Sequence, residues 1–364
     1  MPRPFDFKIL LADASHVGEE LRKQSVALDA VFTSPPYLGQ RQYGNSPAEV
    51  GRGGGAGKYA ERLARILTSL PLRERASIWV NLDDVRGDDG RLLRLPQRLE
   101  AAMETRGWFV AERVAWVKAL VGPDGRGVGS CMPESIRRWR CNDNAFEFVT
   151  RFTRSTSAWS DLCAVGVPRV SRKTKDIRRY LPESLMRATT DVEGRQRLNA
   201  WRINVSKSRA AHYATMPIEL AELAIASSCP QQVCRVCGHA RERIYDLERV
   251  PDEPIQERGP GKYVGADVRA AAAVGFRKYT NNLYVPRMPV TTGWTDCGHN
   301  AYTGGVLCDP FAGSGVSGVA AMRLGRTFLG VELYEKYAAI AYRRCRETLD
   351  MLDRENLDPW RLAA

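Results

Sequence analysis

The segment Val306–Gly315, Val-Leu-Cys-Asp-Pro-Phe-Ala-Gly-Ser-Gly, constrains the fold more than any other part of the chain. Its apolar start reads as a buried strand, which an Asp-Pro turn ends, and two glycines precede a helical pattern. A strand, a glycine-rich turn and a helix in this order place a cofactor at the carboxyl end of a parallel sheet. The sequence therefore predicts an α/β fold with a cofactor site near the C-terminal end.

Within this turn, Gly313 and Gly315 let the backbone approach a ligand where a Cβ atom would clash. Glu332 ends the next predicted strand and is placed to accept hydrogen bonds from ribose hydroxyls. Residues 313–318 also fit the Gly-x-Gly-x-x-Gly pattern of nicotinamide-binding proteins, so the glycines alone do not exclude a dehydrogenase. The Asp-Pro-Phe lead-in and a second motif argue against one.

That second motif, Ser34-Pro35-Pro36-Tyr37, follows the predicted strand Leu28–Thr33, and its prolines stiffen the turn. The Ser34 hydroxyl and the Pro35 carbonyl can accept hydrogen bonds from the exocyclic amine of a base. These bonds would localise the nitrogen lone pair and aim it at a methyl sulfonium, with the acceptors held rigid by Pro36. Tyr37 offers a ring face for an extruded base. The alternative is an ordinary Pro-Pro turn.

Charge points to a polyanionic partner. The 364 residues carry a net charge of +12, which suits nucleic acid, although a basic surface that serves solubility is the alternative. Arginine, the better bidentate phosphate binder, dominates the basic residues in the middle of the chain. The residues predicted to contact phosphates are Arg137, Arg138, Arg140, Arg172, Lys173, Lys175, Arg178 and Arg179. The alternative for this set is a solvated charged face.

The 9 cysteines are unevenly spaced, which is typical of thiols or metal ligands rather than disulfides. Two knuckles, Cys234–His239 and Cys297–His299, predict a structural zinc ribbon. Its expected ligands are Cys234, Cys237 and Cys297, with His299, Cys229 or His239 as the fourth. The alternative is a metal-free loop with incidental thiols.

Periodicity predicts alternating strands and helices, and hence a parallel α/β sheet. No apolar run reaches membrane-spanning length and the first residues lack a signal-peptide core, so we expect a soluble, cytoplasmic protein without a membrane partner. A glycine-rich stretch at 51–57 is expected to be mobile. The expected strands are 8–13, 28–33, 76–82, 306–309 and 327–332, with a candidate antiparallel edge at 109–117 and 146–152; the expected helices are 59–70, 220–226, a helix ending at 324, and 334–352.

The two motifs resemble those of the DNA methyltransferases that use S-adenosylmethionine to methylate exocyclic amines, the N4-cytosine and N6-adenine enzymes. Because the catalytic motif comes first and the cofactor motif near the C-terminal end, the chain is similar to the circularly permuted β group. The resemblance covers most of the chain outside roughly 155–200 and 240–295. Its further matches are Tyr43–Gly44, Trp79–Asp83, Gly107–Lys118, Glu147–Phe148 and His212–Pro217.

This resemblance implies a permuted Rossmann-like sheet with an inserted target-recognition segment, and the cysteine knuckles predict an inserted zinc-ribbon segment in addition. The implied division is a catalytic half at 1–154, a basic target-recognition region at 155–211, a cofactor-closing segment at 212–228, an insertion at 229–300 and a cofactor-binding half at 301–364.

The resemblance also implies roles for single residues. Asp309, Phe311, Gly313, Gly315 and Glu332 would bind the methionine and ribose parts of S-adenosylmethionine. Asp13 matches an acidic residue near the cofactor adenine, although a helix cap is the alternative. His212 and Pro217 belong to the segment that closes the methionine side, although His212 can equally be a partly buried structural histidine.

The activity implied is site-specific methylation of cytosine N4 in duplex DNA after base flipping. Ser34 stands where adenine enzymes usually have Asp or Asn, which favours cytosine over the alternative, adenine N6. C5-cytosine chemistry is disfavoured because it needs a Cys nucleophile, typically in a Pro-Cys pair that this chain lacks. Rival interpretations are a catalytically silent DNA-binding protein and an RNA or protein methyltransferase. A cognate restriction endonuclease is a candidate partner in a bacterial or phage-infected cell, and both a monomer and a homodimer stay open.

Overall fold

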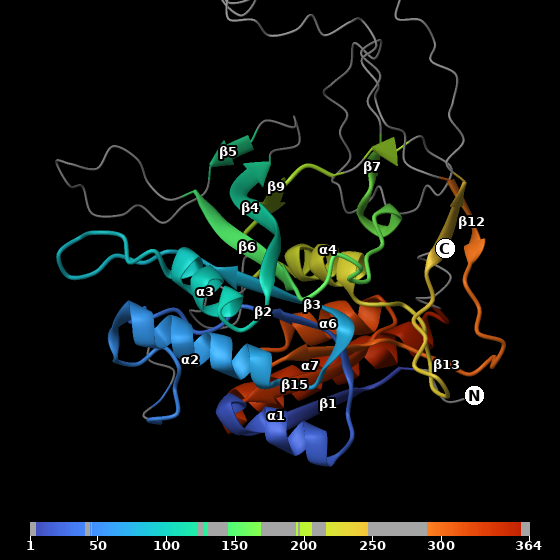
Figure 1. Ribbon diagram of the computed structural model, residues 1–364, viewed down its shortest axis with the longest axis horizontal. Coiled ribbons are helices and arrows are strands. Elements are labelled where there is room, and N and C mark those ends of the chain that lie inside the picture. The colour runs from blue at the N-terminus through green and yellow to red at the C-terminus, as the bar shows by residue number, and fades with distance from the viewer. Residues whose placement is uncertain are drawn as a thin grey trace, which may run out of the picture.

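The computed structural model describes residues 5–40, 44, 46–121, 127–129, 145–168, 194–195, 197–205, 216–246 and 290–357. A nine-stranded sheet forms the centre of this part of the chain (Figure 1). Its order is β1 (Phe7–Leu11), β15 (Thr327–Glu332), β14 (Val306–Asp309), β2 (Leu28–Thr33), β3 (Leu72–Leu82), β6 (Phe146–Thr153), β4 (Phe109–Val121) and β5 (Gly127–Gly129), with β9 (Ala200–Asn204) also beside β4.

The first five strands of that order are parallel. β6 runs antiparallel to both β3 and β4, which confirms the antiparallel edge expected from the sequence. Every residue of β2 is buried, as expected for a central strand that is covered on both faces.

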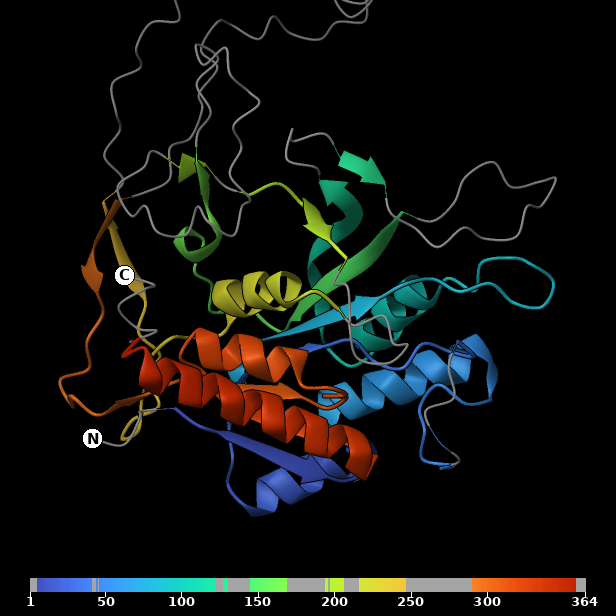
Figure 2. The same cartoon turned by 180° about the vertical axis from the view of Figure 1, so that it is seen from behind.

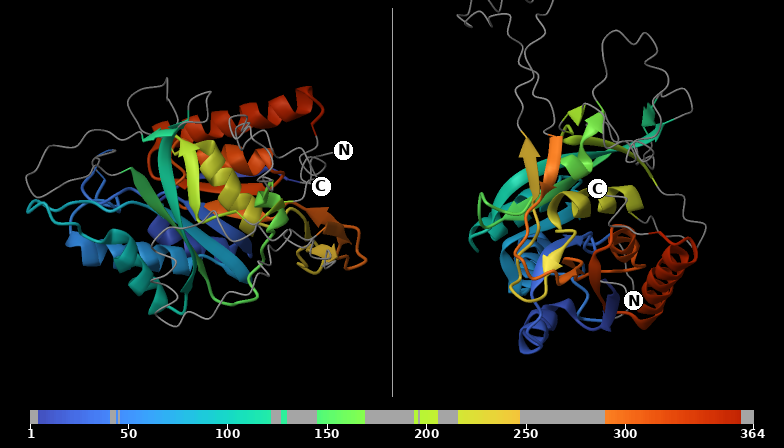
Figure 3. Two further views of the ribbon diagram at one scale, coloured as in Figure 1. Left: turned by 90° about the horizontal axis from the view of Figure 1, so that it is seen from above. Right: turned by 90° about the vertical axis from the view of Figure 1, so that its right-hand side faces the viewer.

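Helices cover both faces of the sheet. One layer consists of α1 (Ala14–Lys23), α2 (Gly55–Ser69) and α3 (Leu95–Glu104), whose apolar sides share a core with one face of the strands. The opposite layer consists of α4 (Ile218–Ser228), α6 (Val316–Arg323) and α7 (Glu335–Arg354), which form a second core. Figure 2 shows this second layer in front, and the view from above in Figure 3 separates the two layers. The α/β fold with a mainly parallel sheet is thereby confirmed.

The order of the strands creates a switch point. β14 and β2 are hydrogen-bonded neighbours, with Leu307 opposite Ala30 and Cys308 opposite Val31. From β14 the chain continues to β15 on one side, whereas from β2 it continues to β3 on the other side. Ligands of open parallel sheets bind where neighbouring connections diverge in this way.

The smaller strands lie outside this sheet. β10 (Val233–Cys234) pairs with β13 (Tyr302–Thr303), β11 (Arg243–Asp246) with β12 (Val290–Trp294), and β7 (Val167–Pro168) with β8 (Gly194–Arg195). The right-hand view in Figure 3 shows β11 and β12 side by side at one end of the molecule. Among the described residues, no helix combines the length and the apolar character of a membrane span.

One expectation about the chain is wrong. The mobile segment predicted at 51–57 ends sooner, because α2 already begins at Gly55. Gly54, with a φ of +84°, makes the left-handed turn into that helix, a conformation that glycine adopts without steric cost. A run of glycines therefore marks the start of a helix here rather than a continuous loop.

Candidate active site

A buried hydrogen bond joins the two sequence motifs. The Thr33 hydroxyl donates to Oδ1 of Asp309 over 2.6 Å, although 276 positions separate the two residues. Each residue is the last of its strand, β2 or β14, and these strands are parallel neighbours. The Ser34–Tyr37 turn and the glycine turn that begins after Asp309 therefore leave the same edge of the sheet side by side.

Asp309 organises the start of the glycine turn. Besides Thr33, its carboxylate accepts hydrogen bonds from the Ser317 hydroxyl and from the Phe311 amide, the latter over 3.0 Å. Burial raises the pKa of this carboxyl, because desolvation disfavours the charged form. The contacts of Asp309 hold the turn, and its predicted contact with the methionine part of a cofactor stays a prediction.

Glu332 closes the other side of the turn. Its Oε2 accepts from the Gly313 amide and its Oε1 from the Tyr334 amide, each over 2.9 Å. Burial raises the pKa of Glu332 as well. Gly313 has a φ of +52°, so the turn that presents its amide to Glu332 uses the backbone freedom of glycine.

Gly315 fulfils a steric requirement. Its φ is +78°, and a Cβ atom there would lie 2.8 Å from the Cα atom of Ala341 in α7. Gly318 is equally confined, because a Cβ would lie 2.5 Å from the sulfur of Cys345. These two glycines permit close packing of α6, so helix packing by itself accounts for two of the three glycines in the literal Gly-x-Gly-x-x-Gly match.

Asp13 follows β1 and caps α1. Its side chain accepts a hydrogen bond from the Ser15 amide over 2.9 Å, so the helix-cap alternative is confirmed. The Ala12 amide donates to the carbonyl of Glu332 over 3.0 Å, which brings Asp13 to the sheet edge next to Glu332. The cap and the predicted role beside the adenine are compatible, because a carboxylate accepts several hydrogen bonds.

The Ser34–Tyr37 turn is held by a polar network from the antiparallel part of the sheet. The Tyr37 hydroxyl donates to Oε2 of Glu147 over 2.7 Å, and the Asn81 amide donates to the same oxygen over 2.9 Å. Lys118 forms an ion pair with Oε1 of Glu147 at 2.8 Å. Burial, followed by the charge of Glu147, raises the pKa of Tyr37 well above its ordinary value. Tyr37 therefore stays a neutral hydrogen-bond donor.

Two further contacts fix the turn. Tyr59, on α2, donates through its hydroxyl to the Pro36 carbonyl over 3.0 Å. The Asn81 side-chain nitrogen lies 3.5 Å from the Ser34 hydroxyl, and its amide oxygen is buried without a hydrogen-bond partner among the described residues. An unpaired buried acceptor is costly unless a ligand satisfies it.

In the sequence, Asn81, Lys118 and Glu147 are matches to a family without an assigned role, and Tyr59 is the first residue of a predicted helix. The one local signal is Asn81, an amide that interrupts the apolar end of the predicted strand 76–82. The other contacts arise because β3, β6 and β4 are adjacent, which no single segment encodes.

Several predicted residues lie outside the described part of the chain: His212, Arg137, Arg138, Arg140, Arg172, Lys173, Lys175, Arg178 and Arg179. Pro217 is described and buried, and it stands at the N-cap position of α4. A separate group of side chains brings the four expected metal ligands, Cys234, Cys237, Cys297 and His299, within 4.8 Å of one another.

Comparison with known proteins supports one family. A family model described as DNA methylase matches residues 28–234 and 298–343. The type II methyltransferase M.SmaI of Serratia marcescens is 21% identical over 367 residues, which cover 93% of this chain and 90% of that protein. M.Cfr9I of Citrobacter freundii is 25% identical over 237 residues, covering 57% of this chain and 68% of the relative.

The fold has a counterpart of known structure. The PvuII DNA methyltransferase, which is described as cytosine-N4-specific, superimposes with a TM-score of 0.50 at 16% identity. The superposition covers 96% of this chain and 92% of the other.

Proposed function

This chain belongs to the DNA methylase family, and from that premise we propose that it transfers a methyl group from S-adenosylmethionine to the N4 amine of cytosine in duplex DNA. That it is a DNA methyltransferase follows from the family; the choice of base is our inference. The observation that carries the proposal is the hydrogen bond between Thr33 and Asp309, which brings the amine-binding turn beside the cofactor turn.

S-adenosylmethionine supplies an electrophilic methyl group on a sulfonium. The residues of the cofactor turn would bind it, with Glu332 at the ribose, Gly313 and Gly315 giving close backbone approach, and Asp13 near the adenine. Strand order supports a permuted arrangement, because the cofactor strand β14 comes late in the chain yet lies at the centre of the sheet.

The Ser34–Tyr37 turn would receive an extruded base. The Ser34 hydroxyl and the Pro35 carbonyl accept hydrogen bonds from the cytosine amine, which keeps the nitrogen lone pair available. When S-adenosylmethionine is bound, the N–C bond would form as its S–C bond breaks, S-adenosylhomocysteine would be the leaving group, and the surplus amine proton would pass to solvent. The contacts of Tyr37 with Glu147 and of Pro36 with Tyr59 hold the turn before the base arrives, which is preorganisation.

The assignment of cytosine as the target base rests on Ser34. Adenine-N6 enzymes of this family usually have Asp or Asn at that position, and adenine N6 is accordingly the second candidate. The relatives named as type II methyltransferases support a modification enzyme in a bacterial restriction–modification system. Whether a cognate endonuclease accompanies it, and whether it acts as a monomer or a homodimer, are separate questions for experiment.

The test uses duplex DNA and S-adenosylmethionine labelled in the methyl group, followed by digestion to nucleosides and mass spectrometry. We expect label in N4-methylcytosine. Label in N6-methyladenine overturns the base assignment but keeps the family, whereas label only in C5-methylcytosine, or in RNA or protein competitors instead of DNA, refutes the proposal. Ser34→Ala should lose turnover and retain cofactor binding; full activity in that variant refutes the acceptor role of Ser34.

A further inference from the structure

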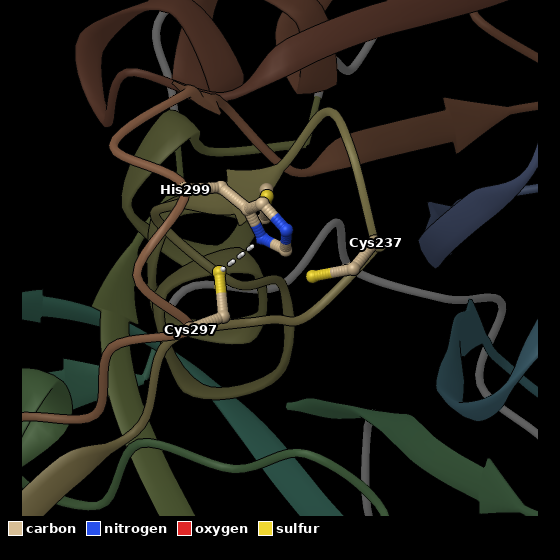
Figure 4. A group of neighbouring side chains, drawn as sticks. Cys237, Cys297 and His299 are labelled. Atoms are coloured by element: carbon tan, nitrogen blue, oxygen red, sulfur yellow. Dashed lines mark hydrogen bonds between the residues drawn. The ribbon is translucent and has the colours of Figure 1, made fainter.

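Two distant segments of the chain contribute four metal-binding side chains to one cluster. Cys234 and Cys237 follow α4, whereas Cys297 and His299 precede β14. Their donor atoms all lie within 4.8 Å of one another, and Figure 4 shows Cys237, Cys297 and His299 directed toward a common centre. We propose that these four residues hold one Zn²⁺ ion in a purely structural site.

The spacing suits tetrahedral zinc. Zinc–sulfur bonds of about 2.3 Å and zinc–nitrogen bonds of about 2.0 Å put tetrahedral ligand atoms about 3.5–3.8 Å apart. Nδ1 of His299 already lies 3.4 Å from the sulfur of Cys297. The remaining separations reach at most 4.8 Å, so closure onto an ion needs movements of about 1 Å. Three thiolates and an imidazole favour zinc over the hard cations magnesium and calcium.

The backbone around the cysteines forms two knuckles. Gly238 and Gly298, directly after Cys237 and Cys297, have φ values of +72° and +77°. The Val236 amide points at the sulfur of Cys234 over 3.4 Å, and the Gly238 amide donates to the Cys234 carbonyl over 2.9 Å. Such amide contacts orient a sulfur ligand before a metal binds.

A second set of contacts supports the other knuckle. Asp296 accepts hydrogen bonds from the Gly298 amide and from the Tyr302 hydroxyl, each over 2.7 Å. Tyr302 also pairs with Cys234 across the β10–β13 ladder. The two knuckles are therefore held in register by their own strands.

The structure selects His299 as the fourth ligand. Cys229 is fully buried at the end of α4 and is not part of the cluster. His239 is also outside the cluster, and its Nε2 lies 3.1 Å from the Thr295 hydroxyl. The sequence left His299, Cys229 and His239 as candidates for the fourth ligand, and of these only His299 lies in the cluster.

The location of the cluster argues for a structural role. A cavity of about 320 Å³ beside it is lined by Cys234 and Cys237 together with Asp29 and Val306, which lie at the starts of β2 and β14. The catalytic turns follow the opposite ends of these strands. Four protein donors also leave no open coordination position for a substrate.

The segments that carry the cluster need a further source of stability. β10 and β13 have only two residues each, and so short a ribbon has little stability by itself. Val236 is 66% exposed and Cys237 is exposed, so apolar burial does not hold this tip of the loop. A zinc ion would fasten the segment after α4 to the segment that leads into β14, and hence brace the strand that precedes the cofactor turn.

The experiment measures metal in the full-length protein, purified without a metal-affinity step, by mass spectrometry. We expect about one zinc per chain, falling at least fivefold in Cys237→Ser and in His299→Ala. Cys163→Ser, which changes a half-buried thiol outside the cluster, and His239→Ala are the matched controls and should keep the metal. His299→Cys should retain zinc, because it preserves the number of donors.

A second readout covers variants that fail to fold. Cobalt exchanged into the wild-type protein should show the visible absorption and sulfur-to-metal charge-transfer bands of a tetrahedral thiolate site. A zinc content near zero without such a spectrum overturns the site. Loss of zinc in His239→Ala but not in His299→Ala overturns the ligand set.

Removal of the metal should lower the unfolding temperature while turnover per folded molecule stays the same. Lost turnover in a folded, metal-free protein overturns the structural role.

Discussion

At the scale of single residues, Glu147 is the residue that Tyr37 of the Ser34–Tyr37 turn, Asn81 and Lys118 all contact. Glu147→Gln removes the charge that receives the Tyr37 and Asn81 hydrogen bonds and pairs with Lys118. We expect turnover to fall at least about tenfold, the cost of one charge-assisted hydrogen bond, while the dissociation constant for S-adenosylmethionine stays unchanged. Single-turnover kinetics and equilibrium binding measure the two effects.

Glu112→Gln is the matched control for that change, because Glu112 pairs with Arg151 within the same antiparallel strands. It should leave turnover within about twofold of the wild type. Equal losses in the two variants would mean that general disturbance of the sheet, and not support of Tyr37, explains the effect.

The buried carboxyl of Asp309 should make the stability of the protein depend on pH. Burial raises its folded-state pKa above the unfolded value of about 4. The folded chain then binds this proton more tightly, so the carboxyl's contribution to stability is present below about pH 4 and is lost as pH rises through the folded pKa. The Asp309→Asn variant has no carboxyl to titrate at this position. As pH rises through the folded-state pKa of Asp309, the free energy of unfolding of the variant should therefore increase relative to that of the wild type. Urea unfolding from pH 4 to 8 measures the difference, and parallel profiles would contradict it.

Residues of the two motifs could be predicted because each motif is continuous in sequence and its chemistry is local. Asn81 and Glu147 could not be assigned roles, because they meet only after β3 and β6 pair. The same holds for Tyr59, which reaches Pro36 from a helix.

At the scale of elements, Gly315 determines how closely α6 approaches α7. Gly315→Ala puts an alanine at a φ of +78° and a Cβ 2.8 Å from Ala341. Gly107→Ala is the matched control, since its φ is +77° and nothing lies within 4 Å of the added atom. Both variants suffer the left-handed strain of about 1–2 kcal/mol. Overpacking should cost Gly315→Ala a further 1–3 kcal/mol or so, measured by chemical unfolding; equal losses would contradict the packing argument.

The bounds of the central strands were easier to predict than those of the helices. β14 and β15 have the bounds expected from sequence, because buried apolar runs end sharply at an acid. α1 and α3 were not predicted: both have ten residues, and so short a periodic pattern hardly differs from a polar loop. Apart from the Asp13 cap of α1, these short helices depend for their stability on packing against the sheet.

At the scale of the whole molecule, the net charge of +12 makes a prediction about DNA binding. Neutralised phosphates release counterions, so affinity should fall at least about tenfold between 50 and 200 mM salt for both cognate and non-cognate duplexes. Fluorescence anisotropy with labelled duplexes measures it. Affinity that is independent of salt would show that the positive charge serves solubility instead.

The α/β class was predictable because alternating patterns dictate it. The neighbours of each strand were not, since β14 lies between β15 and β2 although it comes near the end of the chain. Only resemblance to a family suggested that order. The two cysteine knuckles were already joined in one predicted zinc ribbon, but only the fold places His299, rather than Cys229 or His239, with the three cysteines.

The contact between Thr33 and Asp309 joins two strands that leave the ribosome at very different times, which matters for folding during synthesis. A ribosome that adds 5–20 residues per second releases β14 on the order of 15 to 50 s after β2. During that interval β2 lacks one of its two parallel neighbours and exposes an unpaired edge, a known hazard for aggregation. A nascent chain thus contains the Ser34–Tyr37 turn long before it contains Asp309, the residue that hydrogen-bonds Thr33 at the start of that turn.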